Sequence, residues 1–488
     1  MHLALIYLTG ALFISAASCA SFNPLHHSGP ASPYFDAPSQ DGVPADTPAG
    51  CVVDQATYIL RHGSRYPEPG SFAGWQDLFL KFQNNSYTAS GPLAFIPTWV
   101  PPVDDVPHEP LFLSATGALE SFALGAELRK RYQFTKGGEN ITVWSASQQR
   151  VLDTATFFTR GYLSQGNYLT VPSSNRGSII SLPDSVNFTF ANSLTPSTGC
   201  PAYATGDTGA PSASAFRATY QNAIATRLNK FLDGLTLTST DIGVMQDLCG
   251  FQAEVNGDMR FCDVFEDSEW LDYEYAHDLN YYYGSGPGNP LSATVGFPWV
   301  KAVSDLFALG PGKTTPGGNI TPPALIMGFT HDNNLPPIIS ALGLWNDSRV
   351  EGVYPLSHTA PNPMRKFRAS FLVAFRGYVA LERLACSIVH DTGKTVHVAG
   401  APPTNVTTSS FVRVRVDRAP VAISGCTSGP ASTCPLAQFT AYVNGPRANV
   451  AGNFVQRCGL QNVANATGEA TFLTVIPPDA GEILVGLN

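Results

Sequence analysis

Charged residues are scarce in this sequence. Asp, Glu, Lys and Arg make up only 13% of its 488 residues, about half of their usual share in globular proteins. The chain has 28 Lys and Arg against 37 Asp and Glu, which gives a formal net charge of −9. A general nucleic-acid binder needs a basic face, so this composition argues against one. An anionic ligand must therefore be held by a few cations gathered at one place.

Long apolar runs are also lacking. The run Leu3–Ile14 is too short to span a bilayer, but it has the length of the hydrophobic part of a secretory signal peptide. Ser18, Cys19 and Ala20 follow as a candidate cleavage site. We therefore expect residues 1–20 to be a signal peptide and the mature protein to be secreted, with no membrane partner.

Cysteines are few, but their number suits an exported protein. Nine occur, and loss of Cys19 with the signal leaves an even set, which predicts four disulfides in any of 105 pairings. No close cysteine pair is matched by a second one, as a zinc site would require. The eight are Cys51, Cys200, Cys249, Cys262, Cys386, Cys426, Cys434 and Cys458. Seven sequons predict a glycoprotein: Asn84, Asn140, Asn187, Asn319, Asn346, Asn405 and Asn465.

The chain is long enough for two domains, or for one core with a large insertion. Hydrophobic residues make up 44% of it, enough for a sizeable core. Residues 21–50 are rich in Pro, Ser, Gly and Ala and predict an N-terminal arm without a core. Strand patterns alternate with helical ones in 51–174 and 291–488, which predicts an α/β core. Residues 175–290 are poor in strand signals and predict a mainly helical insertion.

Three of the expected strands end in residues suited to chemistry. In open α/β sheets, ligands bind beyond the carboxyl ends of the strands. The stretch YILRHGSRYP, residues 58–67, places a histidine between two arginines directly after an apolar strand. An arginine opens the helix that follows strand 141–147, and a His-Asp pair ends the strand that begins at residue 324. We therefore expect one site at one sheet edge, formed by Arg61, His62, Arg65, Arg150, His331 and Asp332.

These residue types indicate phosphoryl transfer. The planar guanidinium group of arginine presents N–H donors whose spacing fits phosphate oxygens, and it stays charged. Three arginines would therefore bind a tetrahedral dianion and stabilise a phosphoryl group during its transfer. The positive surroundings should lower the pKa of His62 and leave a ring nitrogen free to attack phosphorus. Asp332 is the candidate acid for the departing alkoxide, and His331 is a further donor to phosphate. Because the arginines supply the charge, no metal and no cofactor are expected.

The motifs resemble one known family. RHGSRYP matches the R-H-G-x-R-x-P signature of the histidine acid phosphatases, the branch of the phosphoglycerate-mutase-like superfamily that includes fungal acid phosphatases and phytases. The resemblance covers most of the chain from about Cys51 onward, because four further stretches are similar to fungal members: SASQQRV, FTHDNN, YYYGSGPGNPL and CTSGPASTCPLAQF. It implies a sandwich with a central, mostly parallel sheet flanked by helices, plus a smaller helical domain.

The resemblance also implies roles for single residues. His62 would form the phosphohistidine, and Asp332 would be the proton donor. The phosphate would be bound by Arg61, Arg65, Arg150 and His331. The implied disulfides are Cys51–Cys386, Cys200–Cys458, Cys249–Cys262 and Cys426–Cys434.

Other candidate motifs have simpler interpretations. His277-Asp278 lies inside a helical pattern and is expected on an ordinary helix surface, and His390-Asp391 precedes Thr-Gly and is typical of a hairpin turn. GPGKTT at 310–315 resembles part of a P-loop, but Phe307 stands where its first glycine should be, so we reject it.

The sequence leaves two alternatives for the range of substrates, a broad acid phosphomonoesterase and a dedicated phytase. Phytate carries six phosphates, and a dedicated phytase should line its pocket with extra Lys or Arg. From Pro67 to Pro101 the only such residue is Lys81, although Lys301 and distant loops could contribute. We therefore expect a broad acid phosphomonoesterase that acts on small phosphate esters, phytate included, with a dedicated phytase as the alternative. A catalytically inactive binding protein on the same fold is a distant one, because neither nucleophile nor acid is missing.

Overall fold

The structure is a computed structural model of the chain and describes residues 22–134, 140–163, 176–184, 190–345, 353–389 and 406–486. The expected signal peptide, the sequons at Asn187, Asn346 and Asn405, and His390-Asp391 lie outside the described residues. The other four sequon asparagines are exposed. Within the described ranges, no helix has both the length and the apolar character of a membrane span.

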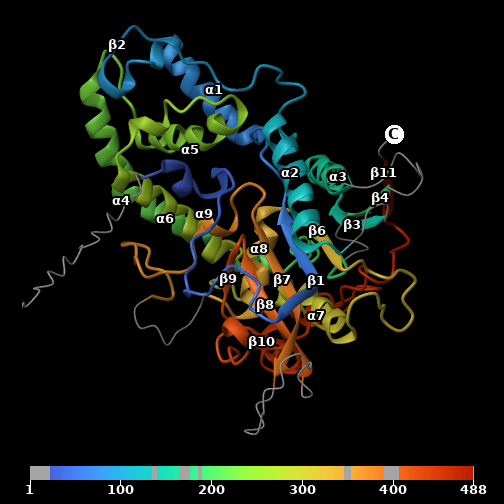
Figure 1. Cartoon of the computed structure of the whole chain (residues 1–488). Coiled ribbons are helices and arrows are strands. Elements are labelled where there is room, and N and C mark those ends of the chain that lie inside the picture. Colours follow the sequence, from blue (N-terminus) through green and yellow to red (C-terminus); the bar gives the residue numbers. More distant parts are fainter. Residues whose placement is uncertain are drawn as a thin grey trace, which may run out of the picture.

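Nine strands in the described part of the chain form one large sheet (Figure 1). Its centre is parallel, in the order β1 (Cys51–Arg61), β6 (Leu325–Thr330), β3 (Ile141–Ala146) and β4 (Arg176–Leu182). Antiparallel strands extend both sides: β7 (Tyr378–Val389), β8 (Val406–Val416), β9 (Ala419–Val421) and β10 (Cys434–Pro435) beyond β1, and β11 (Gly481–Gly486) beyond β4. The predicted α/β fold with a parallel central sheet is confirmed.

Helices cover both faces of this sheet, which explains why β6 is buried at every position. The Phe329 ring packs against Phe158 of α3 (Gln149–Leu163). Its neighbour Gly328 faces Trp299 of α7 (Ser292–Leu309), on the opposite side because successive residues of a strand alternate between faces. α2 (Ala115–Tyr132) packs beside α3, and α8 (Leu335–Leu342) packs beside α7.

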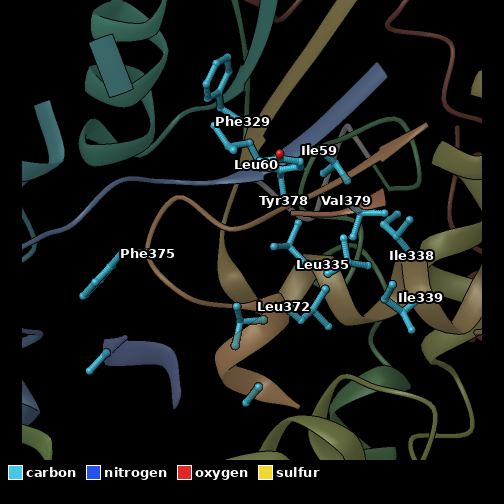
Figure 2. Packing of buried hydrophobic residues seen from close by; sticks show 14 of the residues in the cluster. Ile59, Leu60, Phe329, Leu335, Ile338, Ile339, Leu372, Phe375, Tyr378 and Val379 are labelled. Atoms are coloured by element: carbon cyan, nitrogen blue, oxygen red, sulfur yellow. The ribbon is translucent and has the colours of Figure 1, made fainter. Parts of the chain in front are cut away.

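The core beneath the sheet is apolar and continuous. Leu335, Ile338 and Ile339 of α8 lie against Ile59 of β1 and Val379 of β7 (Figure 2). All five side chains are nearly inaccessible to solvent. This packing positions the carboxyl end of β1, from which the RHGSR segment emerges.

A second group of helices lies over one end of the sheet (Figure 1). It consists of α1 (Pro69–Gln83), α4 (Gly209–Leu228), α5 (Ser239–Val255) and α6 (Asp267–Gly284), with β2 (Thr88–Ala89) paired to β5 (Leu232–Asp233). We propose these elements as the smaller helical domain. β4 falls inside the expected insertion 175–290 but belongs to the sheet, and α1 falls outside it but packs on α5. The proposed domain therefore starts after β4 and takes in α1.

Short elements complete the described chain. The helices α9 (Ala369–Leu372), α10 (Leu436–Tyr442), α11 (Ala448–Ala451) and α12 (Phe454–Arg457) follow late in the sequence. The N-terminal arm contains two short 3₁₀ turns, Pro24–His27 and Gly29–Ala31, which pack on α6. The arm has no core of its own, but Ser28 and Ala31 are buried and the Phe375 amide donates to the Ser32 carbonyl.

The described residues form four disulfides, of which the first two below link distant parts of the chain and the last two close loops with sequence separations of 13 and 8. They are Cys51–Cys386, Cys200–Cys458, Cys249–Cys262 and Cys426–Cys434, the same pairings that the family resemblance implies. The first joins β1 to its antiparallel neighbour β7, where the two cysteines are directly opposite in the register.

Candidate active site

The three strand exits meet, as the sheet rule predicts. Arg61 pairs in register with Thr330, and the His62 amide donates to the Thr330 carbonyl at 3.0 Å. The rings of His62 and His331 lie 5.7 Å apart between centroids. Arg150, in the first turn of α3, places its Nη2 atom 3.4 Å from His331 Nδ1. One pocket of about 520 Å³ is lined by His62, Arg65, Arg150, His331 and Asp332.

Arg61 is held from several sides behind this pocket. Its guanidinium is 1% exposed, and Nη1 donates to the carbonyls of Pro30 and Val373 at 2.5 Å each. Nη2 lies 3.1 Å from Asp332 Oδ2, and the group stacks on the Phe375 ring at 4.4 Å from its centroid. The N-terminal arm therefore supplies, through Pro30, one of the contacts that position a candidate phosphate-binding arginine.

Arg65 and Arg150 share a carboxylate neighbour. Arg65 Nη2 donates to Glu68 Oε1 at 3.1 Å, and Arg150 Nη2 is 4.0 Å from the same oxygen. Glu68 lines the pocket and its side chain is 52% exposed. An anionic oxygen is thus already placed between two arginines that could bind a phosphate oxygen.

His62 has a defined tautomer and a lowered pKa. Its Nδ1 atom lies 2.8 Å from the Gly63 carbonyl, which can only accept, so Nδ1 carries the hydrogen and Nε2 keeps a lone pair. Burial lowers the pKa of His62 well below its usual value, and the charges of Arg61, Arg65 and Arg150 lower it further. The lowered pKa favours the neutral imidazole, whose Nε2 lone pair can act as a nucleophile.

The His-Asp pair is tuned by the same arginines. Burial and the Arg150 charge lower the pKa of His331 to about 4. Burial alone would raise the pKa of Asp332, but the charges of Arg61 and Arg65 outweigh it and lower that pKa. The Tyr281 hydroxyl also hydrogen-bonds the Asp332 carboxylate. In the free protein Asp332 is therefore an ionised carboxylate paired with Arg61.

The geometry can now be set beside known proteins. Residues 52–417 match the family model of the histidine phosphatase superfamily (branch 2). The chain belongs to this family. It is thus a phosphoric monoester hydrolase, and the predicted family and enzyme class are confirmed.

Relatives of this histidine phosphatase are similar over nearly their whole length. Phytase PHO112 of Candida albicans is 28% identical over 91% of this chain and 89% of that protein. Acid phosphatase PHO1 of Komagataella pastoris is 28% identical, with 92% and 90% covered. The crystal structure of the phytase from D. castellii superposes with a TM-score of 0.78 at 22% identity, over 94% of this chain and 93% of that one. The last likeness shows the fold.

Three contacts of the histidine phosphatase site were not identified from the sequence. They are the Pro30 carbonyl on Arg61, the Glu68 carboxylate on Arg65, and the Tyr281 hydroxyl on Asp332. Glu68 follows the RHGSRYP stretch directly and could have been considered from its position alone. Pro30 and Tyr281 lie 31 and 51 residues from their partners in the chain.

The rest of the histidine phosphatase pocket is neutral or acidic. Beyond the anion site its described lining includes Glu68, Asp184 and Asp207, and no Lys or further Arg. Lys81 instead pairs with Asp241 at 2.6 Å, and Lys301 lines a separate cavity beside Asp305. No group of three potential metal ligands occurs among the described residues.

Proposed function

We propose that this histidine phosphatase hydrolyses phosphate monoesters through a phosphohistidine on His62. The observation that carries the proposal is the neutral Nε2 atom of His62 in one pocket with Arg65, Arg150 and His331, and next to Arg61. Nε2 attacks phosphorus, the bond from phosphorus to the leaving oxygen breaks, and Asp332 gives that oxygen a proton. Water then attacks the phosphohistidine, returns a proton to Asp332, and inorganic phosphate leaves.

Asp332 needs a proton for this role, and substrate binding supplies the reason to take one. In the free protein, Arg61 and Arg65 keep the pKa of Asp332 low. A bound phosphate dianion offsets those two positive charges, so the pKa of Asp332 rises on binding. An acidic medium then supplies the proton that the departing alkoxide requires.

The arginines stabilise the transferring phosphoryl group. Three guanidinium groups replace the charge that a metal ion provides in other phosphoryl-transfer enzymes. Arg61 is already oriented by two backbone carbonyls and Asp332. Little reorganisation is therefore required when negative charge develops on the phosphoryl oxygens.

For the substrate, we propose small phosphate monoesters in general, with phytate as a poorer one. The acidic pocket wall formed by Glu68, Asp184 and Asp207 repels a leaving group that carries further phosphates. A dedicated phytase is the second candidate, because relatives named phytase and relatives named acid phosphatase match this chain equally well.

We further propose that the protein is secreted, glycosylated and cleaved after the expected signal peptide. The four disulfides support an oxidising compartment, and the described sequons Asn84, Asn140, Asn319 and Asn465 are exposed.

The phosphohistidine is tested by alkaline quench with p-nitrophenyl phosphate labelled at phosphorus, because phosphohistidine survives alkali and is hydrolysed in acid. We expect an acid-labile, alkali-stable label on the wild type and none on His62→Ala, whose turnover is abolished. The exposed His108 provides the matched control, since His108→Ala should keep both label and turnover. A label that survives acid, as phosphoserine does, would show that His62 is not the nucleophile. A kcat/KM higher for phytate than for p-nitrophenyl phosphate would favour the dedicated phytase.

A further inference from the structure

Ser64 lies between His62 and Arg65, yet its hydroxyl contacts two carboxyl groups outside the phosphate pocket. Ser64 Oγ is 2.9 Å from Glu120 Oε1 of α2 and 2.6 Å from Glu254 Oε2 near the end of α5. The Ser64 amide also donates to Glu120 Oε1 at 2.6 Å. Ser64 itself is fully buried. Two acidic side chains from different helices are therefore connected through Ser64. We call the segment from Arg61 to Arg65, which also carries His62, the catalytic loop.

If Glu120 and Glu254 were both ionised, the Ser64 hydroxyl could not supply a hydrogen for both of its contacts with them. The Ser64 hydroxyl has one hydrogen and can donate it to only one of the two carboxyl groups. The other contact then needs a hydrogen on the second carboxyl, which donates to Ser64 Oγ. From this geometry we propose that Glu120 and Glu254 share one proton across Ser64 and are positioning residues for the catalytic loop.

The surroundings favour retention of that proton. Burial raises the pKa of Glu120 to about 7 against the opposing charge of Arg376, and burial also raises the pKa of Glu254. Glu254 stands in the last turn of α5, where the helix dipole disfavours a negative charge. Arg65, in the same loop, donates to Glu68 and Tyr66 instead. The two carboxyls titrate as a pair, so the proton belongs to the pair.

The loop that carries His62 and Arg65 packs tightly against α2, so its position depends on whether the Glu120–Glu254 pair holds its proton. The Ser64 carbonyl accepts from the amide and the hydroxyl of Ser114, the residue that caps α2. A Cβ atom added to Gly117 of α2 would lie 2.0 Å from the Ser64 carbonyl oxygen, so the helix and the loop are in direct contact. When the shared proton is lost, two carboxylates repel each other across Ser64. The loop that carries His62 and Arg65 must then move relative to α2 and α5.

The sign of the resulting pH dependence follows from the raised pKa values. A glutamate in the unfolded chain has a pKa of about 4.3, and folding raises the pKa of both members of the pair. Their contribution to stability is complete below the unfolded value and is lost as the pH rises toward about 7. The catalytic loop is therefore held best in an acidic medium.

The decisive variant is Glu254→Gln, whose amide donates to Ser64 Oγ without needing a proton. We expect the ratio of its kcat/KM to that of the wild type to rise about tenfold between pH 5 and pH 8. The pKa of Glu120 is raised to about 7, so pH 8 lies about one unit above it, and one unit corresponds to a factor of ten in the ratio of ionised to protonated carboxyl. The ratio cancels the ionisation of the substrate and of Asp332, which both enzymes share. The control is Glu469→Gln, an exposed glutamate that lines a different cavity, for which the ratio should stay flat.

Two further measurements do not depend on the phosphohistidine mechanism. At pH 6, subtraction of the infrared spectrum of Glu254→Gln or Glu120→Gln from that of the wild type should leave the carbonyl band of a protonated carboxyl, because other buried acids such as Asp417 contribute equally to both spectra. The melting temperature of the wild type should fall more between pH 5 and pH 7.5 than that of either variant. A flat kcat/KM ratio for both variants, or no protonated-carboxyl band in the difference between the wild type and either variant, would overturn the proposal while leaving the role of His62 intact.

Discussion

Two groups of buried arginines in this protein differ in how their charge is matched. At α6, Arg365 donates to Asp278 Oδ2 at 2.6 Å and to Glu274 Oε2 at 3.1 Å, while Arg368 reaches the same Glu274 oxygen at 3.0 Å. The Asp278 carboxylate also accepts the Ala369 amide. Two cations thus meet two fully buried anions, and the cluster ties α6 to the chain before α9.

The arginines of the active site are matched only in part. Arg61, Arg65 and Arg150 have Asp332 and the half-exposed Glu68 as their acidic partners. Burial lowers the pKa of the neighbouring histidines, and the excess positive charge lowers it further. Such an excess of positive charge favours binding of an anion. A buried charge is stabilised when its partners are complete. They are incomplete here, and we propose that a phosphate group of the substrate is the further partner.

The comparison is tested most strongly at Arg365. Arg365→Ala leaves Glu274 and Asp278 buried without their main partner, which should cost about 3–5 kcal/mol in the free energy of unfolding. Urea denaturation measures this loss. The neighbouring Lys366, an exposed residue paired with Asp41, is the control, and Lys366→Ala should change stability little. A loss below about 1 kcal/mol for Arg365→Ala would mean that the cluster is not structural.

Arg150 should show the opposite behaviour. Burial lowers the pKa of Arg150 despite the nearby carboxylates of Glu68 and Asp332, so removal of its charge in Arg150→Ala should leave the stability unchanged or slightly higher. The same variant should lose about 10²–10³ in kcat/KM, as other enzymes do when one group that stabilises transition-state charge is removed. Arg160→Ala, an exposed position on the same helix, should keep full activity. Equal losses of stability for Arg150→Ala and Arg365→Ala would erase the distinction between the two clusters.

Asp332 separates proton donation from charge pairing. If Asp332 is the general acid, Asp332→Asn should slow the phosphorylation step for glycerol phosphate about 10² more than for p-nitrophenyl phosphate, whose phenolate leaves without a proton. Rapid-quench burst kinetics must isolate that step, because hydrolysis of the phosphohistidine is common to both substrates. Equal losses would limit Asp332 to positioning Arg61 and leave the proton donor unassigned.

Glu68 should produce the smallest effect. Glu68→Gln removes a carboxylate that competes with phosphate for Arg65 and Arg150, so KM for p-nitrophenyl phosphate should fall. An exposed ion pair is worth about 0.2–1 kcal/mol, which limits the change to a few-fold. The gain should be larger for phytate, since its further phosphates meet a less acidic wall. A KM that rises instead would show that Glu68 helps to bind substrate.

One expectation from the sequence was wrong for a physical reason. His277-Asp278 was expected on a helix surface, but Asp278 is 0% exposed and is paired with Arg365. The pattern of α6 mixes charged residues with Trp and Tyr at most positions, and neighbouring helices and the N-terminal arm cover several of its faces. A residue pair inside such a helix cannot be assigned to the surface from its own sequence.

The positions of the strand ends at the active site, and the residues that follow them, could be predicted from local sequence patterns. Apolar patterns predict β1, β3 and β6, and parallel strands bring their carboxyl ends to one edge, so Arg61, His62, Arg150 and Asp332 could be placed together without coordinates. Those predictions depend on patterns within about ten residues of each strand end.

The surroundings of these side chains depend on contacts between distant parts of the chain, which are visible only in the folded protein. The Pro30 carbonyl contacts Arg61 because the N-terminal arm packs beside α6. Glu120 and Glu254 both contact Ser64 because α2 and α5 approach each other at this residue. The members of each pair are separated by 31 and 134 residues. Their approach results from burial of apolar surface elsewhere in the fold, which has no trace in the local sequence around either partner.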